Sequence, residues 1–242
     1  MRLLVTGGLG FIGSRLINWI LQNQEDVHIV NVDALTYAGN LANLAQWEQD
    51  ARYTWVKASI ADPIAMQRVF QTQSFDAVVN LAAESHVDRS IHNGLPFVDT
   101  NVRGTEVLLE AARQTGVPRF LQVSTDEVYG SRTDGQFFTE DSPLHPSSPY
   151  AASKAAADEF VMAAATTYGQ NVVITRCTNN YGPQQFPEKL IPLCITNGLE
   201  GKPWPLYGDG QQVRDWIYVD DHARGIWEVL QKGNAGTVYN LA

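Results

Sequence analysis

Two neighbouring carboxylates, Asp126 and Glu127, lie in the segment STDEVYG, which spans residues 124–130. Adjacent carboxyl groups can act as an acid and a base on one substrate when their surroundings hold them in opposite protonation states. A second interpretation is structural, because Ser124-x-x-Glu127 fits a capping box whose side chains bind backbone N–H groups at a helix start. The two interpretations predict opposite directions for the Glu127 side chain.

A phenol and an ammonium group, Tyr150 and Lys154, lie four residues apart in the segment YAASK. Side chains at this spacing are neighbours on one face of a helix. In a chain of this composition about 0.2 such pairs are expected by chance, so the spacing alone is weak evidence. Its weight depends on the fold that surrounds it.

A glycine-rich turn in the segment VTGGLGFIG, residues 5–13, contains two overlapping forms of the dinucleotide-binding fingerprint. One starts at Gly7 and the other at Gly8, and both end at Gly13. Asp33 follows 20 residues later at the end of a second apolar run, where a carboxylate can bind ribose hydroxyls. An ordinary turn residue is the alternative for Asp33. Because a carboxylate would repel a 2′-phosphate, the pattern favours NAD over NADP.

Apolar runs alternate with segments of helical length, and these elements must position the residues above. We expect strands at 2–6, 27–33, 53–57, 75–82, 119–124 and 172–176, and helices at 11–22, 63–73, 101–115 and 150–168. Repeated strand and helix units predict an α/β fold with a Rossmann-type doubly wound parallel sheet, covered by helices on both faces.

The regular alternation ends near residue 177, where prolines punctuate shorter pieces. We expect an NAD-binding Rossmann domain over residues 1–176. Residues 177–242 are expected to form a smaller, irregular substrate-binding lobe, with some elements returning to the Rossmann domain. The segment 130–149, rich in Ser, Pro and Gly, is long for a connection and is expected to be a lid or binding segment.

Composition excludes several classes of function. The 242 residues contain no window of about 18 uncharged apolar residues, so we expect a cytoplasmic protein without a membrane span. A formal net charge of −9 argues against broad nucleic-acid binding, which requires many Lys and Arg side chains. The two cysteines and five histidines lack metal-ligand spacing, so no metal site and no structural disulfide are expected.

Three long strings together carry a family resemblance: AAESHVDRS at 82–90, TDEVYG at 125–130 and NNYGPQQFPEKL at 179–190. With the glycine turn and the Tyr150/Lys154 pair, they resemble the dTDP-glucose 4,6-dehydratase family of the extended short-chain dehydrogenase/reductase superfamily. That family serves the synthesis of deoxysugars and of rhamnose precursors. The resemblance runs from Met1 to Ala242.

This resemblance implies an NAD-dependent hydro-lyase that oxidises dTDP-glucose at carbon 4, eliminates water across carbons 5 and 6 and returns hydride to carbon 6. Tyr150 would take the proton of the 4-hydroxyl. Because a free tyrosine has a pKa of about 10, positive charge from Lys154 and the nicotinamide ring would have to lower it. Glu127 would be the base at carbon 5, Asp126 the acid for the departing 6-hydroxyl, and Thr125 a hydrogen-bond partner near the 4-oxygen.

Further contacts follow from the same resemblance. The implied cofactor contacts are Gly7, Gly10, Phe11, Ile12, Gly13, Asp33, Ser59, Ile60, Leu81, Ala82, Ala83, Thr100, Tyr150, Lys154 and Asn180. The implied substrate contacts are Ser85, Thr125, Asn179, Lys189, Leu190, Pro205, Tyr207 and Arg214. A guanidinium such as that of Arg214 suits a diphosphate, and an ion pair with Asp209 or Asp215 is its structural alternative. His86 is expected to be a structural hydrogen bonder.

Two departures from the family pattern qualify these expectations. Ser59 stands where the family carries an aspartate that binds the adenine amino group, so a weaker adenine contact is expected. The family continues beyond Ala242, so we expect an incomplete substrate lobe, either through truncation or as a natural short form.

Other functions stay open on the sequence. A nucleotide-sugar epimerase or decarboxylase of the same superfamily would share the cofactor but would not need the Asp126–Glu127 pair. A truncated, noncatalytic NAD-binding protein is a further alternative. Helices 101–115 and 150–168 match those that pair in homodimers of the family.

Overall fold

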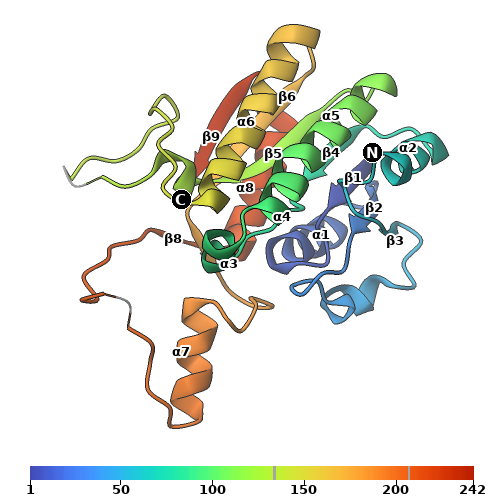
Figure 1. The fold of residues 1–242 in the computed structure, drawn as a ribbon. Helices are drawn as coiled ribbons and strands as arrows, with labels where there is room; N and C mark the ends of the chain where they lie inside the picture. The colour runs from blue at the N-terminus through green and yellow to red at the C-terminus, as the bar shows by residue number, and fades with distance from the viewer. Residues whose placement is uncertain (133–134, 207) are drawn as a thin grey trace.

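The structure is a computed structural model that describes residues 1–132, 135–206 and 208–242 (Figure 1). A parallel sheet with the strand order β3-β2-β1-β4-β5-β6-β9 forms its centre. Its strands are β1 (Arg2–Thr6), β2 (His28–Asp33), β3 (Tyr53–Lys57), β4 (Ala77–Asn80), β5 (Phe120–Thr125), β6 (Val172–Cys177) and β9 (Thr237–Leu241). A small second sheet pairs β7 (Asn179–Tyr181) with β8 (Trp216–Tyr218). The predicted Rossmann-type sheet is confirmed.

Helices connect these strands. They are α1 (Phe11–Asn23), η1 (Leu41–Trp47), α2 (Pro63–Thr72), α3 (Val87–His92), α4 (Leu95–Phe97), η2 (Val98–Arg103), α5 (Gly104–Gln114), η3 (Asp126–Tyr129), α6 (Pro149–Tyr168), α7 (Leu190–Leu199) and α8 (Val219–Lys232). Among the described residues, none of these helices is both long and apolar enough to cross a membrane.

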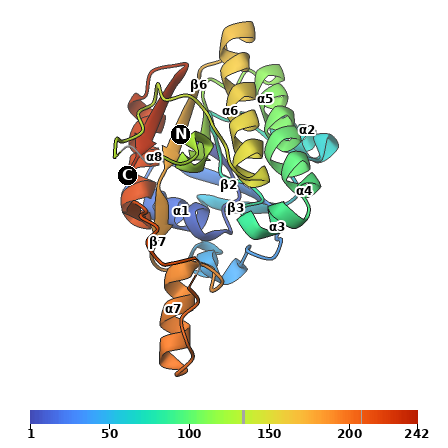
Figure 2. The same ribbon diagram turned by 60° about the vertical axis from the view of Figure 1, so that its left-hand side comes forward.

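Helices cover both faces of the sheet because the strand side chains alternate between two buried clusters. Leu3 and Val5 of β1 pack with α1 and α8, whereas Leu4 between them packs with α2, α5 and α6. Figures 1 and 2 show these two helix layers on opposite sides of the strands. Parallel strands buried on both faces are the arrangement expected of near-continuous apolar runs.

The chain after Cys177 divides between two places. Helix α8 packs on α1, where Trp19 and Trp227 have ring centroids 6.2 Å apart, and β9 pairs with β6. Helix α7, by contrast, extends away from the sheet in both views and contains no buried residue (Figures 1 and 2). The division of the chain at residue 177 stays a prediction.

The helix expected at 101–115 begins differently in the structure. Residues Val98–Arg103 form a π-helical turn, and α5 starts only at Gly104. The turn directs the Asn101 side chain to the Glu84 backbone, where it accepts N–H at 2.8 Å and donates to the carbonyl at 3.0 Å. It also donates to Ser153 Oγ at 2.8 Å. Periodicity alone cannot reveal such a turn, although π turns are frequent near functional sites.

Candidate active site

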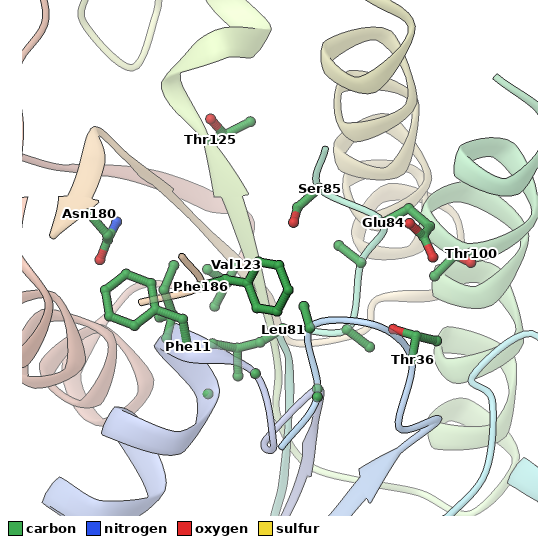
Figure 3. Close-up of a pocket in the computed structure, with 18 of the residues that line it drawn as sticks. Phe11, Thr36, Leu81, Glu84, Ser85, Thr100, Val123, Thr125, Asn180 and Phe186 are labelled. Atoms are coloured by element: carbon green, nitrogen blue, oxygen red, sulfur yellow. The ribbon is translucent and has the colours of Figure 1, made fainter. Parts of the chain in front are cut away.

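A cavity of about 570 Å³ opens at the carboxyl ends of the central strands, where the strand order reverses beside β1. Parallel α/β sheets bind ligands at this place. All the cofactor contacts expected from the sequence line the cavity. Figure 3 shows Phe11 and Asn180 on one side of it and Thr100 and Glu84 on the other, with Thr125 at the end of β5.

The glycine turn after β1 is shaped for close approach by a ligand. Gly7 has a φ of +70°, which favours glycine, and a Cβ there would lie 2.7 Å from the Ala82 nitrogen. A Cβ on Gly13 would lie 2.3 Å from the Gly7 carbonyl oxygen. Because α1 begins at Phe11 without a side-chain cap, its first N–H groups favour an anion at the cavity. The turn therefore fits a pyrophosphate.

Asp33 lies at the end of β2, where it lines the cavity. Its carboxylate accepts the N–H groups of Leu9 at 2.9 Å and Leu35 at 2.8 Å, so its orientation is fixed beside the glycine turn. Ser59 also lines the cavity, and its Oγ accepts the Ala61 N–H at 3.2 Å. A carboxylate at one position and a hydroxyl at the other give this end of the cavity hydrogen-bond acceptors suited to a ribose and an adenine.

Tyr150 and Lys154 both reach the cavity from the first turns of α6. The helix starts here because Ser148 caps it, with its Oγ accepting the Ala151 N–H at 3.1 Å, and proline follows at the first helical position. The ammonium of Lys154 is buried and donates to the Val123 carbonyl at 2.7 Å.

The electrostatics of this pair differ from the sequence expectation. Burial raises the pKa of Tyr150 above its ordinary value, and the charge of Glu127 raises it further. Burial also lowers the pKa of Lys154. The side chains alone therefore oppose a tyrosine phenolate, because desolvation and nearby negative charges both disfavour the ionised form. The lowered pKa expected for Tyr150 is not provided by the chain's own groups.

The acid and base candidates lie on the short helix η3, directly after β5. Thr125 caps this helix, and its Oγ1 accepts the Glu127 N–H at 3.2 Å while its hydroxyl donates to Asp126 Oδ1 at 3.3 Å. Thr125 and Glu127 line the cavity, whereas Asp126 does not and is joined to it through Thr125. The alternative interpretation, a capping box at Ser124, is wrong, because Ser124 is still paired in β5 opposite Arg176 and the cap is the next residue, Thr125.

The Glu127 side chain lines the cavity, as expected of a residue that acts on a substrate. Burial raises the pKa of Glu127, and the charge of Asp126 raises it further, whereas Lys189 and Arg214 lower it. Burial also raises the pKa of Asp126. Both carboxyl groups are thus shifted toward the range in which they can exchange protons near neutral pH.

Most of the substrate contacts expected from the sequence line the same cavity as Glu127. Ser85, Asn179, Lys189, Leu190 and Arg214 line the cavity, and Lys189 Nζ donates to the Ser85 carbonyl at 3.4 Å.

Two of the substrate expectations have other outcomes, and the structural alternative for Arg214 can be checked. Pro205 is not among the cavity-lining residues, and Tyr207 lies outside the described residues. Within the described ranges Arg214 forms no ion pair with Asp209 or Asp215, which leaves its guanidinium available to an anion.

Sequence reasoning missed several residues that line the cavity, including Tyr37, Glu84, Phe186 and Glu188. Tyr37 meets Phe186 edge to face at 5.6 Å, and the Arg89 guanidinium lies 4.0 Å from the Tyr37 ring centroid. Three of the missed residues lie inside the strings that carry the family resemblance, so position in those strings was the available signal.

His86 has a structural contact, as expected. Its Nδ1 accepts the Arg89 N–H at 3.4 Å at the start of α3, and its Nε2 lies 3.4 Å from Glu188 Oε2. The part of the chain that the structure describes holds no group of three or more His, Cys, Asp or Glu side chains placed to bind a metal ion.

Comparison with known proteins agrees with this geometry. The family model described as GDP-mannose 4,6 dehydratase matches residues 4–242. The chain belongs to this family. Its curated relatives include a probable dTDP-glucose 4,6-dehydratase of Sinorhizobium fredii, 52% identical over 250 residues that cover 100% of this chain and 71% of the relative. The dTDP-glucose 4,6-dehydratase 1 of Escherichia coli K12 is 50% identical over 259 residues, covering 100% and 72%.

Solved structures of similar sequence share the fold. DesIV, a dTDP-glucose 4,6-dehydratase from Streptomyces venezuelae solved with NAD bound, has a TM-score of 0.95 and 52% identity, with 99% of this chain and 75% of DesIV covered. A UDP-glucose 4-epimerase from Thermotoga maritima, solved with UDP-glucose, has a TM-score of 0.91 and 32% identity, with coverage of 100% and 76%. The dehydratases are thus much more similar in sequence than this epimerase, although both share the fold.

Proposed function

We propose that the chain is an NAD-dependent dTDP-glucose 4,6-dehydratase that forms dTDP-4-dehydro-6-deoxyglucose. The observation that carries this proposal is the meeting of two sets of groups in one cavity. Tyr150 and Lys154 line it together with Thr125 and Glu127, and Asp126 is joined to it through Thr125. A dehydratase needs both sets, whereas an epimerase or decarboxylase needs no elimination pair.

The cavity fits NAD through its glycine turn and Asp33. A side chain at Gly7 or Gly13 would collide with neighbouring backbone, so glycine is needed to keep the turn that brings the first N–H groups of α1 to a pyrophosphate. The Asp33 carboxylate disfavours a 2′-phosphate. Bound NAD would supply a hydride acceptor and donor for carbons 4 and 6 and positive charge near Tyr150. Ser59 would accept a hydrogen bond from the adenine without charge assistance.

Oxidation at carbon 4 begins with proton removal by Tyr150. Because burial raises the pKa of this phenol, it requires nearby positive charge to act as a base near neutral pH. The buried Lys154 ammonium, fixed on the Val123 carbonyl, would hold the nicotinamide ribose, and Thr125 would hydrogen-bond the 4-oxygen.

Elimination follows because a ketone at carbon 4 acidifies the proton on carbon 5. Glu127 removes that proton, and Lys189 and Arg214 favour the ionised form of its carboxylate. Asp126, whose pKa is raised by burial, donates a proton to the departing 6-hydroxyl, and Thr125 joins it to the cavity. Loss of one proton and one hydroxide as water balances this step.

Arg214, Lys189 and Asn179 would bind the substrate diphosphate. A guanidinium without a carboxylate partner in the described ranges can bind phosphate oxygens through two parallel hydrogen bonds. A homodimer formed through α5 and α6, a cytoplasmic location and a place in rhamnose synthesis stay predictions that rest on family resemblance.

The test is incubation of the chain with NAD and dTDP-glucose, or with UDP-glucose as a comparison, in deuterated water. A 4-keto-6-deoxy sugar with deuterium at carbon 5 is expected from dTDP-glucose. An epimerised product that has lost no water would overturn the proposal in favour of another activity. Binding of NAD without turnover of either sugar would favour a noncatalytic protein.

A further inference from the structure

A buried ion pair lies behind the acid–base turn, outside the cavity. Arg176 Nε, on β6, donates to Asp158 Oδ2, on α6, at 2.9 Å, and the two side chains are 6% and 1% exposed. Removing two charges from water is costly, so such a pair is weak evidence for a gain in stability. The reaction proposed above gives neither residue a role. Their connections indicate one.

On one side, the pair is connected to the acid–base turn. Arg176 Nη1 donates to the Tyr129 hydroxyl oxygen at 3.0 Å, and the guanidinium carbon lies 4.9 Å from the centre of the Tyr129 ring. Tyr129 is the last residue of η3 and lies two positions after Glu127. Its hydroxyl donates in turn to Asn240 Oδ1 on β9 at 2.8 Å. The end of the turn is therefore fixed by buried hydrogen bonds.

On the other side, the pair is connected to the catalytic helix. Asp158 lies four residues after Lys154, which itself lies four residues after Tyr150, so all three share one face of α6. The Asp158 carboxylate raises the pKa of Lys154 against the effect of burial. Arg176, Lys154 and the Ser124 hydroxyl all lower the pKa of Asp158, which opposes burial in turn.

On the basis of the dehydratase function, we propose that Asp158 and Arg176 are positioning residues that hold the acid–base turn in register with the Tyr150–Lys154 helix. Elimination requires Glu127 to reach the carbon next to the one that Tyr150 has helped to oxidise. The two steps act on one substrate in one cavity, so an error of about 1 Å between these elements can slow turnover about 100-fold. A buried chain of hydrogen bonds from Asp158 through Arg176 and Tyr129 to Asn240 is suited to this task because it restricts how the turn and the helix can move relative to each other.

Tyr129→Phe tests the connection to the turn, because it removes one hydroxyl and keeps the ring on Arg176. We expect elimination to slow about 10-fold while substrate still reduces NAD, so that NADH absorbance accumulates after mixing. Arg176→Lys keeps the positive charge but loses the guanidinium that donates to both Asp158 and Tyr129. This variant should show the same slower elimination as Tyr129→Phe. Tyr168→Phe, at an exposed tyrosine at the end of α6, is the matched control.

Asp158→Asn tests the connection to the helix. We expect kcat to fall about 10- to 100-fold and the alkaline limb of the pH profile for NAD reduction to move to lower pH, because Lys154 loses its proton more readily. Cys177 is the other titratable group that faces Lys154, and its pKa is raised by burial to about 12, which keeps it neutral over that range. Glu159→Gln removes the same charge from the adjacent exposed residue and is the control.

Amide hydrogen exchange gives a measure that does not depend on turnover. Faster exchange over residues 124–130 in Tyr129→Phe and Arg176→Lys, but not in the controls, is expected. Wild-type exchange together with wild-type NADH kinetics in both variants would overturn the positioning role, even if Asp158→Asn fails to fold. A wild-type chain without dehydratase activity would overturn the proposed function alone, and the exchange result would still decide the positioning role.

Discussion

His222 Nδ1 lies 2.7 Å from Asn180 Oδ1, so a residue of α8 fixes an amide that lines the cavity. Burial lowers the pKa of His222 to about 4, and the imidazole is therefore neutral near pH 7. As a neutral donor to the amide oxygen, it directs the Asn180 nitrogen toward the Thr178 carbonyl, at 3.0 Å, and toward Cys177 Sγ, at 3.3 Å. Asn180 thus presents one orientation to a cofactor.

The same histidine makes stability depend on pH. The unfolded chain takes up a proton near the ordinary histidine pKa of about 6.5, whereas the folded chain does so only near a pKa of about 4. The free energy of unfolding should therefore decrease as pH falls below 6.5, by about 2 kcal/mol at pH 5. Urea unfolding at pH 8 and pH 5 measures this decrease. Between these two pH values, the free energy of unfolding of His222→Gln should fall by about 2 kcal/mol less than that of wild type. The exposed His28→Gln should follow wild type; an equal pH response in His222→Gln would contradict the assignment.

Gly13→Ala should weaken both folding and NAD binding. The new Cβ would lie 2.3 Å from the Gly7 carbonyl oxygen and 2.8 Å from the Gly8 Cα, and backbone at both contacts cannot move as a flexible side chain can. We expect a loss of about 1–3 kcal/mol in the free energy of unfolding and a raised Kd for NAD, measured by urea unfolding and calorimetry. Gly94→Ala meets its nearest side chain at an ordinary 3.6 Å and serves as the control. Unchanged NAD affinity in Gly13→Ala would argue against the glycine turn as the pyrophosphate site.

Ser59→Asp should tighten NAD binding. A hydrogen bond to an ionised acceptor is roughly twice as strong as one to a neutral acceptor, which corresponds to about a fivefold lower Kd. Ser59→Asn has nearly the same shape as the aspartate but no charge, so it should give little of this gain. Isothermal titration calorimetry measures the Kd for NAD of wild type, Ser59→Asp and Ser59→Asn. A raised Kd in Ser59→Asp would show that the adenine does not meet this position.

The local motifs could be predicted from sequence because each depends on a few neighbouring residues. The turn at Gly7, the carboxylate at Asp33 and the pair on α6 all lie where strand and helix patterns placed them. Sequence could not choose between the two fingerprint forms. In the structure the Gly8 N–H donates to Asn31 Oδ1 at 3.0 Å and Gly8 does not line the cavity, so the form that starts at Gly7 faces the ligand site.

Other features depend on contacts between distant segments. The one-residue error at the cap of η3 arose because the end of β5 is set by its pairing with β6, where Thr125 lies opposite Cys177. The described residues of segment 130–149 do not line the cavity, and Glu140 instead accepts the Asn240 N–H at 2.9 Å. No local pattern in the sequence indicates that β9 would meet this segment.

Glu127→Gln separates the two chemical steps of the proposed reaction. The amide keeps the size of the side chain but cannot take the proton from carbon 5, so turnover should fall about 100- to 10,000-fold. Tyr150 and Lys154 are unchanged, and substrate should still reduce bound NAD. Stopped-flow absorbance of NADH and chromatography of the sugar product measure the two steps separately. Glu106→Gln, at an exposed position on α5, is the control for the loss of a carboxylate.

The pH dependence of the wild-type enzyme gives an independent check on Glu127. Because burial and the charge of Asp126 raise the pKa of Glu127, the base loses activity by protonation at a higher pH than an exposed glutamate would. The acid limb of the elimination rate should therefore lie above the usual range for glutamate, about pH 4.3. Lys189→Met removes a charge that lowers this pKa, so the limb should move to still higher pH. If the acid limb lies at the same pH in Lys189→Met as in wild type, it reports the protonation of a group other than Glu127.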